Sequence, residues 1–490
     1  MFQAGLCIDI MVKKTLISQK DHHAGNFGFV YRSSAIFYYT LSIKQKTTIS
    51  FMNYWKPKRN LEVWIIASLR NMKGDLERRE EILFADGQVI NYRPEVPYLP
   101  FEGSVEIEVF SSTNMRVPYS AIMAVYESDD SVSLVHSYSR VYSPHEVEEA
   151  RTITTGEESG WTLRDDSKVR GFAVFHNGNI QQDQQEITME ITNSLNETKV
   201  VHIDMPSLRA YETVKLYPSD YCPEIVEFLS GSPGNVTLSY KLANSFTRML
   251  VGNETLDQSE MQVTHSNFNY AKHTTDFLDS EDVAFMTVPP IGSTNLGVVI
   301  YPGFQSGNYG AVYGEDEVLF SDGMRLEFPV KGGVIYFNKK DGLLPTRIVT
   351  ALTGRLEASN CVLPFECSLG VFHTQSPPRG THWAVVTADS KYRSRLIAVH
   401  YPEIYENNED GKYDIWLYSS KNMSTLHKSV TAENLEDFRT GVYISDIFPE
   451  AESFLDGDFG YFYLKSPYVG LIIYSTIEST TGSMTLEHSF

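Results

Sequence analysis

The chain has 490 residues, of which 42% are hydrophobic and 21% charged, a composition typical of a globular protein with two or more domains. Its formal net charge of −21 argues against nucleic acids and anionic membrane surfaces as partners, because these partners are themselves negatively charged. No apolar run approaches the roughly 18 residues that a membrane-spanning helix requires.

Residues 1–51 differ from the rest of the chain. They contain five lysines and only two acidic residues, and no regular apolar period runs through them. We therefore expect 1–51 to be an extra N-terminal segment that is poorly ordered. One hypothesis is that Met52 is the native first residue, and the other is that the preceding residues form a weakly docked arm. Because this region lacks the order of a secretory signal, we expect a cytoplasmic protein, with secretion by another route left open.

From Met52 onward the dominant apolar period is two residues. In GSVEIEVF (103–110), Val105, Ile107 and Val109 alternate with acidic residues, which is typical of a strand buried on one face. Shorter, continuously apolar runs at 119–126, 296–301 and 469–475 suit strands buried on both faces. Gly, Asn, Asp, Ser and Pro interrupt these runs every 8–12 residues or so, which predicts an all-β protein.

Two short segments break the strand pattern and resemble each other. SDYCPEIVEFLSGSPG (219–234) and SDIFPEAESFLDGDFG (445–460) align without a gap at an offset of 226. Each contains a Ser-Asp pair, a Pro-Glu pair and a following Gly, which predicts one or two capped helical turns in each segment.

Other internal matches occur in the same order. His265 and Ser266 match His488 and Ser489, and weaker matches pair 60–87 with 295–323 and 108–125 with 370–386. We therefore predict a tandem duplication of a jelly-roll-like antiparallel β-sandwich unit, in which each unit is one large sandwich or two small ones in series. The first repeat is expected at 52–270, with an insert at about 140–185, and the second at 280–490.

Several histidines lie at the ends of apolar runs, where the strands of a sandwich meet its rim. Three imidazoles and a carboxylate at one rim would suit zinc, copper or iron. The chain contains no compact ligand motif, however, so structural roles are favoured, and we assign no metal and no cofactor. The residues concerned are His136, His176, His265, His373, His400 and His488.

No nucleophile elbow or phosphate-binding loop occurs, and the catalytic residues remain unknown. Segments that mix aromatic and polar residues suit sugars, because rings stack on sugar faces while polar groups bind hydroxyls. The first interpretation is a non-enzymatic binding or assembly protein that recognises carbohydrate or a protein partner. The alternative is a carbohydrate-active or metal-dependent enzyme with its site on the first repeat or between repeats. The candidate ligand-binding residues are His136, Arg140, Trp161, His176 and His265.

Overall fold

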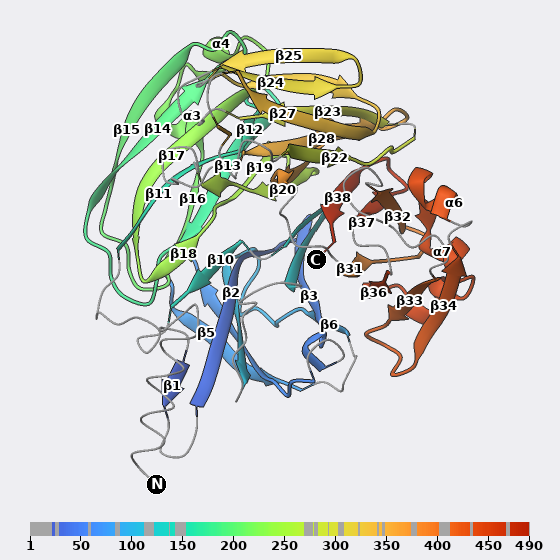
Figure 1. Cartoon of the computed structure of the whole chain (residues 1–490). Helices are drawn as coiled ribbons and strands as arrows, with labels where there is room; N and C mark the ends of the chain where they lie inside the picture. Colours follow the sequence, from blue (N-terminus) through green and yellow to red (C-terminus); the bar gives the residue numbers. More distant parts are fainter. Residues whose placement is uncertain are drawn as a thin grey trace, which may run out of the picture.

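The chain is an all-β protein built from antiparallel sheets, as predicted from the sequence (Figure 1). The computed structural model describes residues 22–24, 29–56, 60–83, 89–111, 122–136, 138–142, 153–268, 278, 283–292, 294–301, 308–321, 324–340, 343–344, 348–373, 380–400, 412–431, 435–466 and 471–489. Every strand pairing among these residues is antiparallel, and their helices are at most six residues long.

The strands of the first sandwich form the sheets β5-β4-β7-β2 and β6-β3-β8-β9, which are joined only where Leu41 pairs with Lys46. Its strands are β2 (Phe29–Leu41), β3 (Gln45–Met52), β4 (Trp64–Asn71), β5 (Leu76–Ile82), β6 (Val89–Tyr92), β7 (Phe101–Ser111), β8 (Ile122–Ser128) and β9 (Val132–His136). In β7, Val105, Ile107 and Val109 lie in the core, as the period of two predicts. The expectation that this strand is buried on one face only is wrong, because Glu106 and Glu108 on the opposite face are buried as well.

The second sandwich repeats this arrangement with the sheets β15-β14-β17-β11 and β16-β13-β19-β20. Its strands are β11 (Ile153–Ser159), β13 (Val169–His176), β14 (Gln185–Thr192), β15 (Thr198–Met205), β16 (Thr213–Leu216), β17 (Gly234–Ala243), β19 (Leu250–Thr255) and β20 (Met261–His265). Helices α3 (Pro218–Tyr221) and α4 (Ile225–Leu229) lie between β16 and β17.

The third sandwich has the sheets β25-β24-β27-β22 and β26-β23-β28-β29. Its strands are β22 (Ala284–Val288), β23 (Thr294–Ile300), β24 (Asn308–Tyr313), β25 (Asp316–Ser321), β26 (Leu326–Val330), β27 (Gly333–Lys339), β28 (Thr350–Leu356) and β29 (Phe365–Leu369).

The fourth sandwich has the sheets β34-β33-β36-β31 and β35-β32-β37-β38. Its strands are β31 (Thr381–Val386), β32 (Tyr392–His400), β33 (Lys412–Tyr418), β34 (Thr425–Thr431), β35 (Val442–Tyr443), β36 (Gly460–Lys465), β37 (Leu471–Ser479) and β38 (Met484–His488). Its helices are α6 (Leu435–Thr440), α7 (Ile444–Ile447) and α8 (Ala451–Leu455), and the last two follow β35.

The four sandwiches share one topology. If the eight strands of each are numbered along the chain, the two sheets have the orders 4-3-6-1 and 5-2-7-8 in every sandwich. Small strands outside this pattern are β1 (His22–Ala24), β10 (Ser139–Val141), β12 (Thr162–Leu163), β18 (Ser245–Thr247), β21 (Asn267–Phe268) and β30 (Phe372–His373). The part of the chain that the structure describes therefore carries one topology four times.

This topology tests the individual sequence matches. The helical segments at 219–234 and 445–460 are equivalent, since they precede strand 6 in the second and fourth sandwiches. The match of 108–125 with 370–386 is wrong, because it aligns β7 and β8 with β30 and β31. The match of 60–87 with 295–323 joins equivalent strands only at its end, where β5 faces β25. Short apolar runs resemble one another whether or not their strands are equivalent.

Three further expectations need correction. Residues 29–52 are not a poorly ordered segment, because β2 and β3 lie in the first sandwich. Residues 35–39 of β2 are at most 1% exposed. The predicted insert at about 140–185 contains β11, β13 and the start of β14, whose equivalents in the fourth sandwich are β31, β32 and β33. Helix α3 begins at Pro218 with Tyr217 as its N-cap, and neither helix of this segment has a side-chain cap.

The sandwiches are arranged around a centre, near which the C-terminus lies (Figure 1). The last strand of each sandwich is the edge of its sheet, and these four strands contact one another in the cyclic order β9, β20, β29 and β38. We call them the central strands. The chain thus brings together four elements that are widely separated in sequence.

Candidate functional site

The central strands contact one another through side chains instead of extending their sheets. Ser133 Oγ donates to Val263 O at 3.1 Å and accepts from Val263 N at 2.8 Å, which joins β9 to β20. Leu134 N donates to Thr485 Oγ1 at 3.1 Å, which joins β9 to β38. Backbone groups at a sheet edge need partners, and short hydroxyl side chains provide them here while preventing continuous strand pairing.

Three of the central strands end in histidine. His136, His265 and His488 occupy the last paired position of β9, β20 and β38, and Leu369 occupies that position in β29. The rings of His136 and His265 have centroids 4.5 Å apart, and those of His136 and His488 are 5.3 Å apart. The structure therefore brings together two of the predicted ligand-binding residues, His136 and His265, with a third histidine at the rim.

Glu487 adds a carboxylate to this group of histidines. Ser483, directly before β38, and Thr485 and Glu487 within it contact β9 at Val132 N, Leu134 N and the His136 ring. Glu487 Oε2 lies 3.2 Å from His136 Nδ1, and Glu487 Oε1 lies 3.6 Å from His488 Nε2. Donor atoms of all three residues lie within 4.8 Å of one another, close enough to bind a single metal ion.

The charge of Glu487 is stabilised by its neighbours. Burial acts to raise the pKa of the Glu487 carboxyl, but His136, His488 and the backbone N–H of His488 together hold that pKa below its usual value. Burial is also the main cause of a pKa of His265 well below its usual value, and nearby His136 and Arg248 lower it further. The cluster therefore combines an ionised carboxylate with a neutral imidazole at neutral pH.

Hydrogen bonds also orient two of the rings. His265 Nδ1 lies 2.7 Å from the carbonyl oxygen of Ser266, and His488 Nδ1 lies 3.3 Å from that of Ser489. A carbonyl oxygen only accepts hydrogen bonds, so each Nδ1 carries the proton when the ring is neutral. The Nε2 atom of each ring then has a lone pair, which is the state that a metal ligand requires.

The other predicted ligand-binding residues are placed elsewhere, and their role in binding stays a prediction. Trp161 is in the core of the second sandwich, where its Nε1 donates to Gly252 O. Arg140 is buried on β10 with its guanidinium over the Tyr142 ring. His176 is fully buried, and burial lowers its pKa to about 3. Arg140 and His176 are thus enclosed by the protein, whereas Trp161 also lines a small pocket with Arg164 and Glu366.

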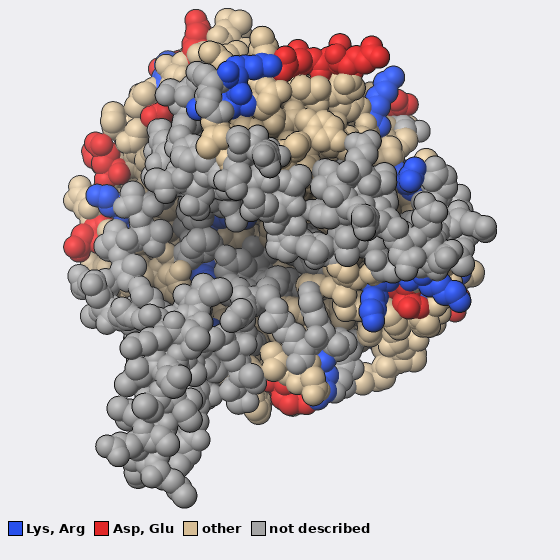
Figure 2. Space-filling view, in the orientation of Figure 1, with Lys and Arg blue, Asp and Glu red and all other residues tan. Residues whose placement is uncertain are grey.

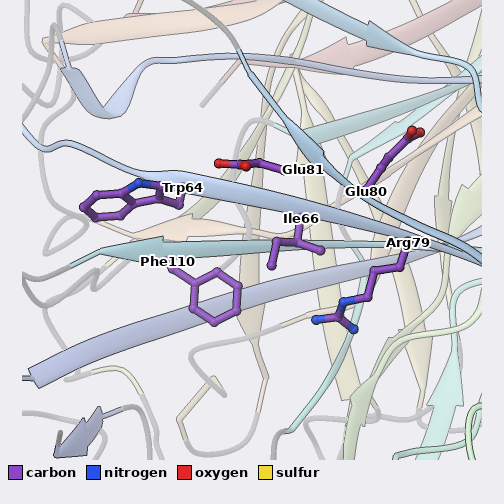
Figure 3. Close-up of a pocket in the computed structure, with 6 residues that line it drawn as sticks. All are labelled: Trp64, Ile66, Arg79, Glu80, Glu81 and Phe110. Atoms are coloured by element: carbon purple, nitrogen blue, oxygen red, sulfur yellow. The ribbon is translucent and has the colours of Figure 1, made fainter.

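A groove on the first sandwich was not predicted from the sequence. It has a volume of about 500 Å³ and lies on the outer face of the sheet that contains β4, β5 and β7 (Figure 3). It is lined by Trp64, Ile66, Arg79, Glu80, Glu81 and Phe110. The sequence signal was the alternation of β4, in which Ile65, Ala67 and Leu69 face the core while Trp64 and Ile66 point the other way.

Pairing between strands places the rings of Trp64 and Phe110 beside charged side chains of β5 in the groove. Trp64 pairs directly with Phe110, and Ile66 pairs with Glu81 on its other side. The Trp64 side chain is 55% exposed, whereas Phe110 is half-buried. Figure 3 shows Arg79 and Glu80 pointing to opposite sides of β5, as neighbours on a strand do. The groove thus combines a flat aromatic surface with charged groups at its margin.

Ion pairs hold the Arg79 side chain at the margin of the groove. Arg79 Nη2 lies 2.8 Å from Glu108 Oε2, and Glu108 Oε1 lies 2.7 Å from Arg32 Nε. Arg32 also binds Glu106, whose pKa is raised by burial although Arg32 opposes this shift. Glu106 and Glu108 are buried, so the network holds Arg79 in a defined position beside the two rings.

The surface charges in the described part of the chain are mixed in sign. Figure 2 shows Lys and Arg residues near Asp and Glu residues around the rim of the molecule. The described residues contain no helix that is long and apolar enough to cross a membrane.

Comparisons with known proteins do not identify this chain. No protein-family model matches it, and no curated protein matches it. One solved structure that resembles it is the native conformation of α-2-macroglobulin from E. coli, at 9% identity and a TM-score of 0.09. That match covers 90% of this chain and 28% of the α-2-macroglobulin chain. At this level of similarity the match supports no conclusion about function.

Proposed function

We propose that this protein is a non-enzymatic binding protein that recognises a carbohydrate through the groove on the first sandwich. The observation that carries the proposal is the exposed Trp64 ring beside Phe110, on the outer face of a rigid sheet. Aromatic side chains are amphipathic surfaces that lose little conformational entropy on binding, and sugar rings present apolar C–H faces that stack on them.

The charged residues of the groove suit the hydroxyl groups of a sugar. Arg79 provides several N–H donors, and the exposed Glu81 carboxylate provides acceptors. Because Arg79 is already bound to Glu108, its position is set before a ligand arrives, which reduces the entropic cost of binding. This arrangement favours a sugar over an apolar ligand, since an apolar ligand would leave these charges without new partners.

A glycan array with the full chain tests the proposal, followed by calorimetry on the sugars that bind. Trp64→Ala should weaken binding by roughly tenfold or more, since removing a central aromatic residue of a binding surface costs about 2 kcal/mol. Leu76→Ala is the matched control, because Leu76 is 50% exposed on β5 but does not line the groove. An array without any binding, or equal affinity of both variants, would contradict the proposal.

A further inference from the structure

We infer that the central strands hold a site for one transition-metal ion of the zinc class, with His136, Glu487 and His488 as its ligands. The site lies between the first and fourth sandwiches, and none of its residues lines the groove. It is independent of the proposed carbohydrate binding. Two imidazoles and a carboxylate are a ligand set that zinc and neighbouring metals accept.

The distances between the ligand atoms fit such an ion. Zinc bonds to nitrogen and oxygen are about 2.0–2.2 Å long, so adjacent ligand atoms in a tetrahedral site lie about 3.3–3.6 Å apart. The separations of 3.2 Å between His136 Nδ1 and Glu487 Oε2, and 3.6 Å between His488 Nε2 and Glu487 Oε1, are close to this range. The ligand atoms therefore need only small movements to surround an ion. Because the Glu487 carboxylate only accepts hydrogen bonds, His136 Nδ1 carries the ring proton without metal, and an ion bound to this atom displaces that proton.

The placement of the side chains also suits a metal ion. The Glu487 side chain is only 5% exposed, and its two oxygens lie next to His136 Nδ1 and His488 Nε2. The bond from His488 Nδ1 to the Ser489 carbonyl leaves Nε2 as the ligand atom. A backbone carbonyl that accepts the second ring N–H is the usual support for a metal-bound histidine.

The location implies a structural consequence. His136 lies in the last strand of the first sandwich, and Glu487 and His488 lie in the last strand of the fourth. A bound ion would therefore link the two sandwiches at opposite ends of the chain and close the ring of central strands. His265 packs its ring against His136 and acts as a positioning residue in this arrangement.

Elemental analysis and calorimetric titration with Zn²⁺ test the inference on the full chain after treatment with a chelator. We expect one ion per chain and a higher melting temperature in its presence, because a ligand that binds only the folded state stabilises it. Glu487→Gln and His488→Gln should each weaken Zn²⁺ binding by at least tenfold. His427→Gln is the matched control, since His427 forms an exposed pair with Asp414 outside the central strands.

Two results would overturn the inference. One is the absence of binding at micromolar Zn²⁺, and the other is unchanged affinity in both variants of the cluster. If a variant fails to fold, Co²⁺ added to the unmodified chain decides the matter through its visible absorption. A spectrum typical of Co²⁺ bound to nitrogen ligands in a low coordination number supports the site, whereas the spectrum of the hydrated ion contradicts it.

Discussion

His136 and His176 are alike in sequence, since each ends an apolar strand, yet their surroundings differ. His136 lies beside a carboxylate and two other imidazoles. His176 is fully buried, and the only hydrogen bond of its ring among the described residues joins Nδ1 to Thr213 Oγ1 at 2.9 Å. Burial without a charged partner favours the neutral ring, which explains why its pKa falls to about 3.

This difference predicts a pH dependence for His176. The unfolded chain takes up a proton on His176 below pH 6.5 or so, while the folded chain does not until about pH 3, so stability falls as pH decreases between these values. His176→Gln should remove roughly 1.4 kcal/mol per pH unit from the slope of the unfolding free energy between about pH 6 and 4. Urea denaturation at several pH values measures that slope.

His202→Gln is the control for this experiment, because His202 is exposed on β15 beside Glu186. It should leave the slope unchanged. Equal slopes for His176→Gln and the unmodified chain would show that His176 is not the neutral buried group described here.

At the scale of the element, the central strands depend on hydroxyl side chains. Each sheet ends in a strand whose outer backbone groups would otherwise be unpaired in the interior of the protein. Ser133 satisfies both the N–H and the carbonyl of Val263, and Ser131 does the same for Met261. These contacts set the position of β9 along β20. The bonds from Val132 N to Ser483 Oγ and from Leu134 N to Thr485 Oγ1 set its position along β38, which places His136 level with Glu487.

Ser133→Ala should therefore destabilise the protein by about 1–3 kcal/mol, the cost of leaving buried polar groups unpaired. Chemical denaturation measures this loss. Ser33→Ala is a matched control, because Ser33 is a buried serine of β2 whose hydroxyl has no hydrogen-bond partner among the described residues. Equal effects of the two substitutions would show that removal of any buried hydroxyl, and not the contact with β20, causes the loss.

At the scale of the whole molecule, the sandwiches share their cores. The cluster around the first sandwich includes Val263 of the second sandwich and Trp383 and Tyr461 of the fourth. Tyr54 stacks on Trp383 with ring centroids 5.2 Å apart, and Arg93 forms an ion pair with Asp458 at 2.7 Å. The first and last sandwiches are therefore held together by buried apolar area as well as by charge.

Shared cores predict that a change in one sandwich affects another. Tyr54→Ala should cost about 3–5 kcal/mol, since it removes a large buried ring. Hydrogen exchange should then become faster in β31 and β36 of the fourth sandwich as well as in β3. The expectation fails if faster exchange is confined to the first sandwich.

Tyr309→Ala is the control for this comparison. Tyr309 is equally buried, but it stacks on Phe320 within the third sandwich. Its replacement should increase exchange mainly in β24 and β25. The contrast between the two variants separates coupling across an interface from a general loss of stability.

The sequence by itself determined the fold class, because apolar alternation along a strand is a local property. Val105, Ile107 and Val109 face the core as their spacing predicts, and the matching helical segments are equivalent. Local pattern failed for β2, since its residues 35–39 are buried on both faces and show no alternation. It also left open whether each unit is one large sandwich or two small ones, because the order of strands in a sheet cannot be read from the spacing of residues.

Only the tertiary structure decided which residues lie together. His136 and Glu487 are 351 positions apart, and their contact depends on the packing of two edge strands from different sandwiches. Trp64 and Phe110 lie side by side because the register of β4 with β7 pairs these two residues. The type of a residue limits the chemistry of its side chain. Strand order and register determine which other side chains lie beside it.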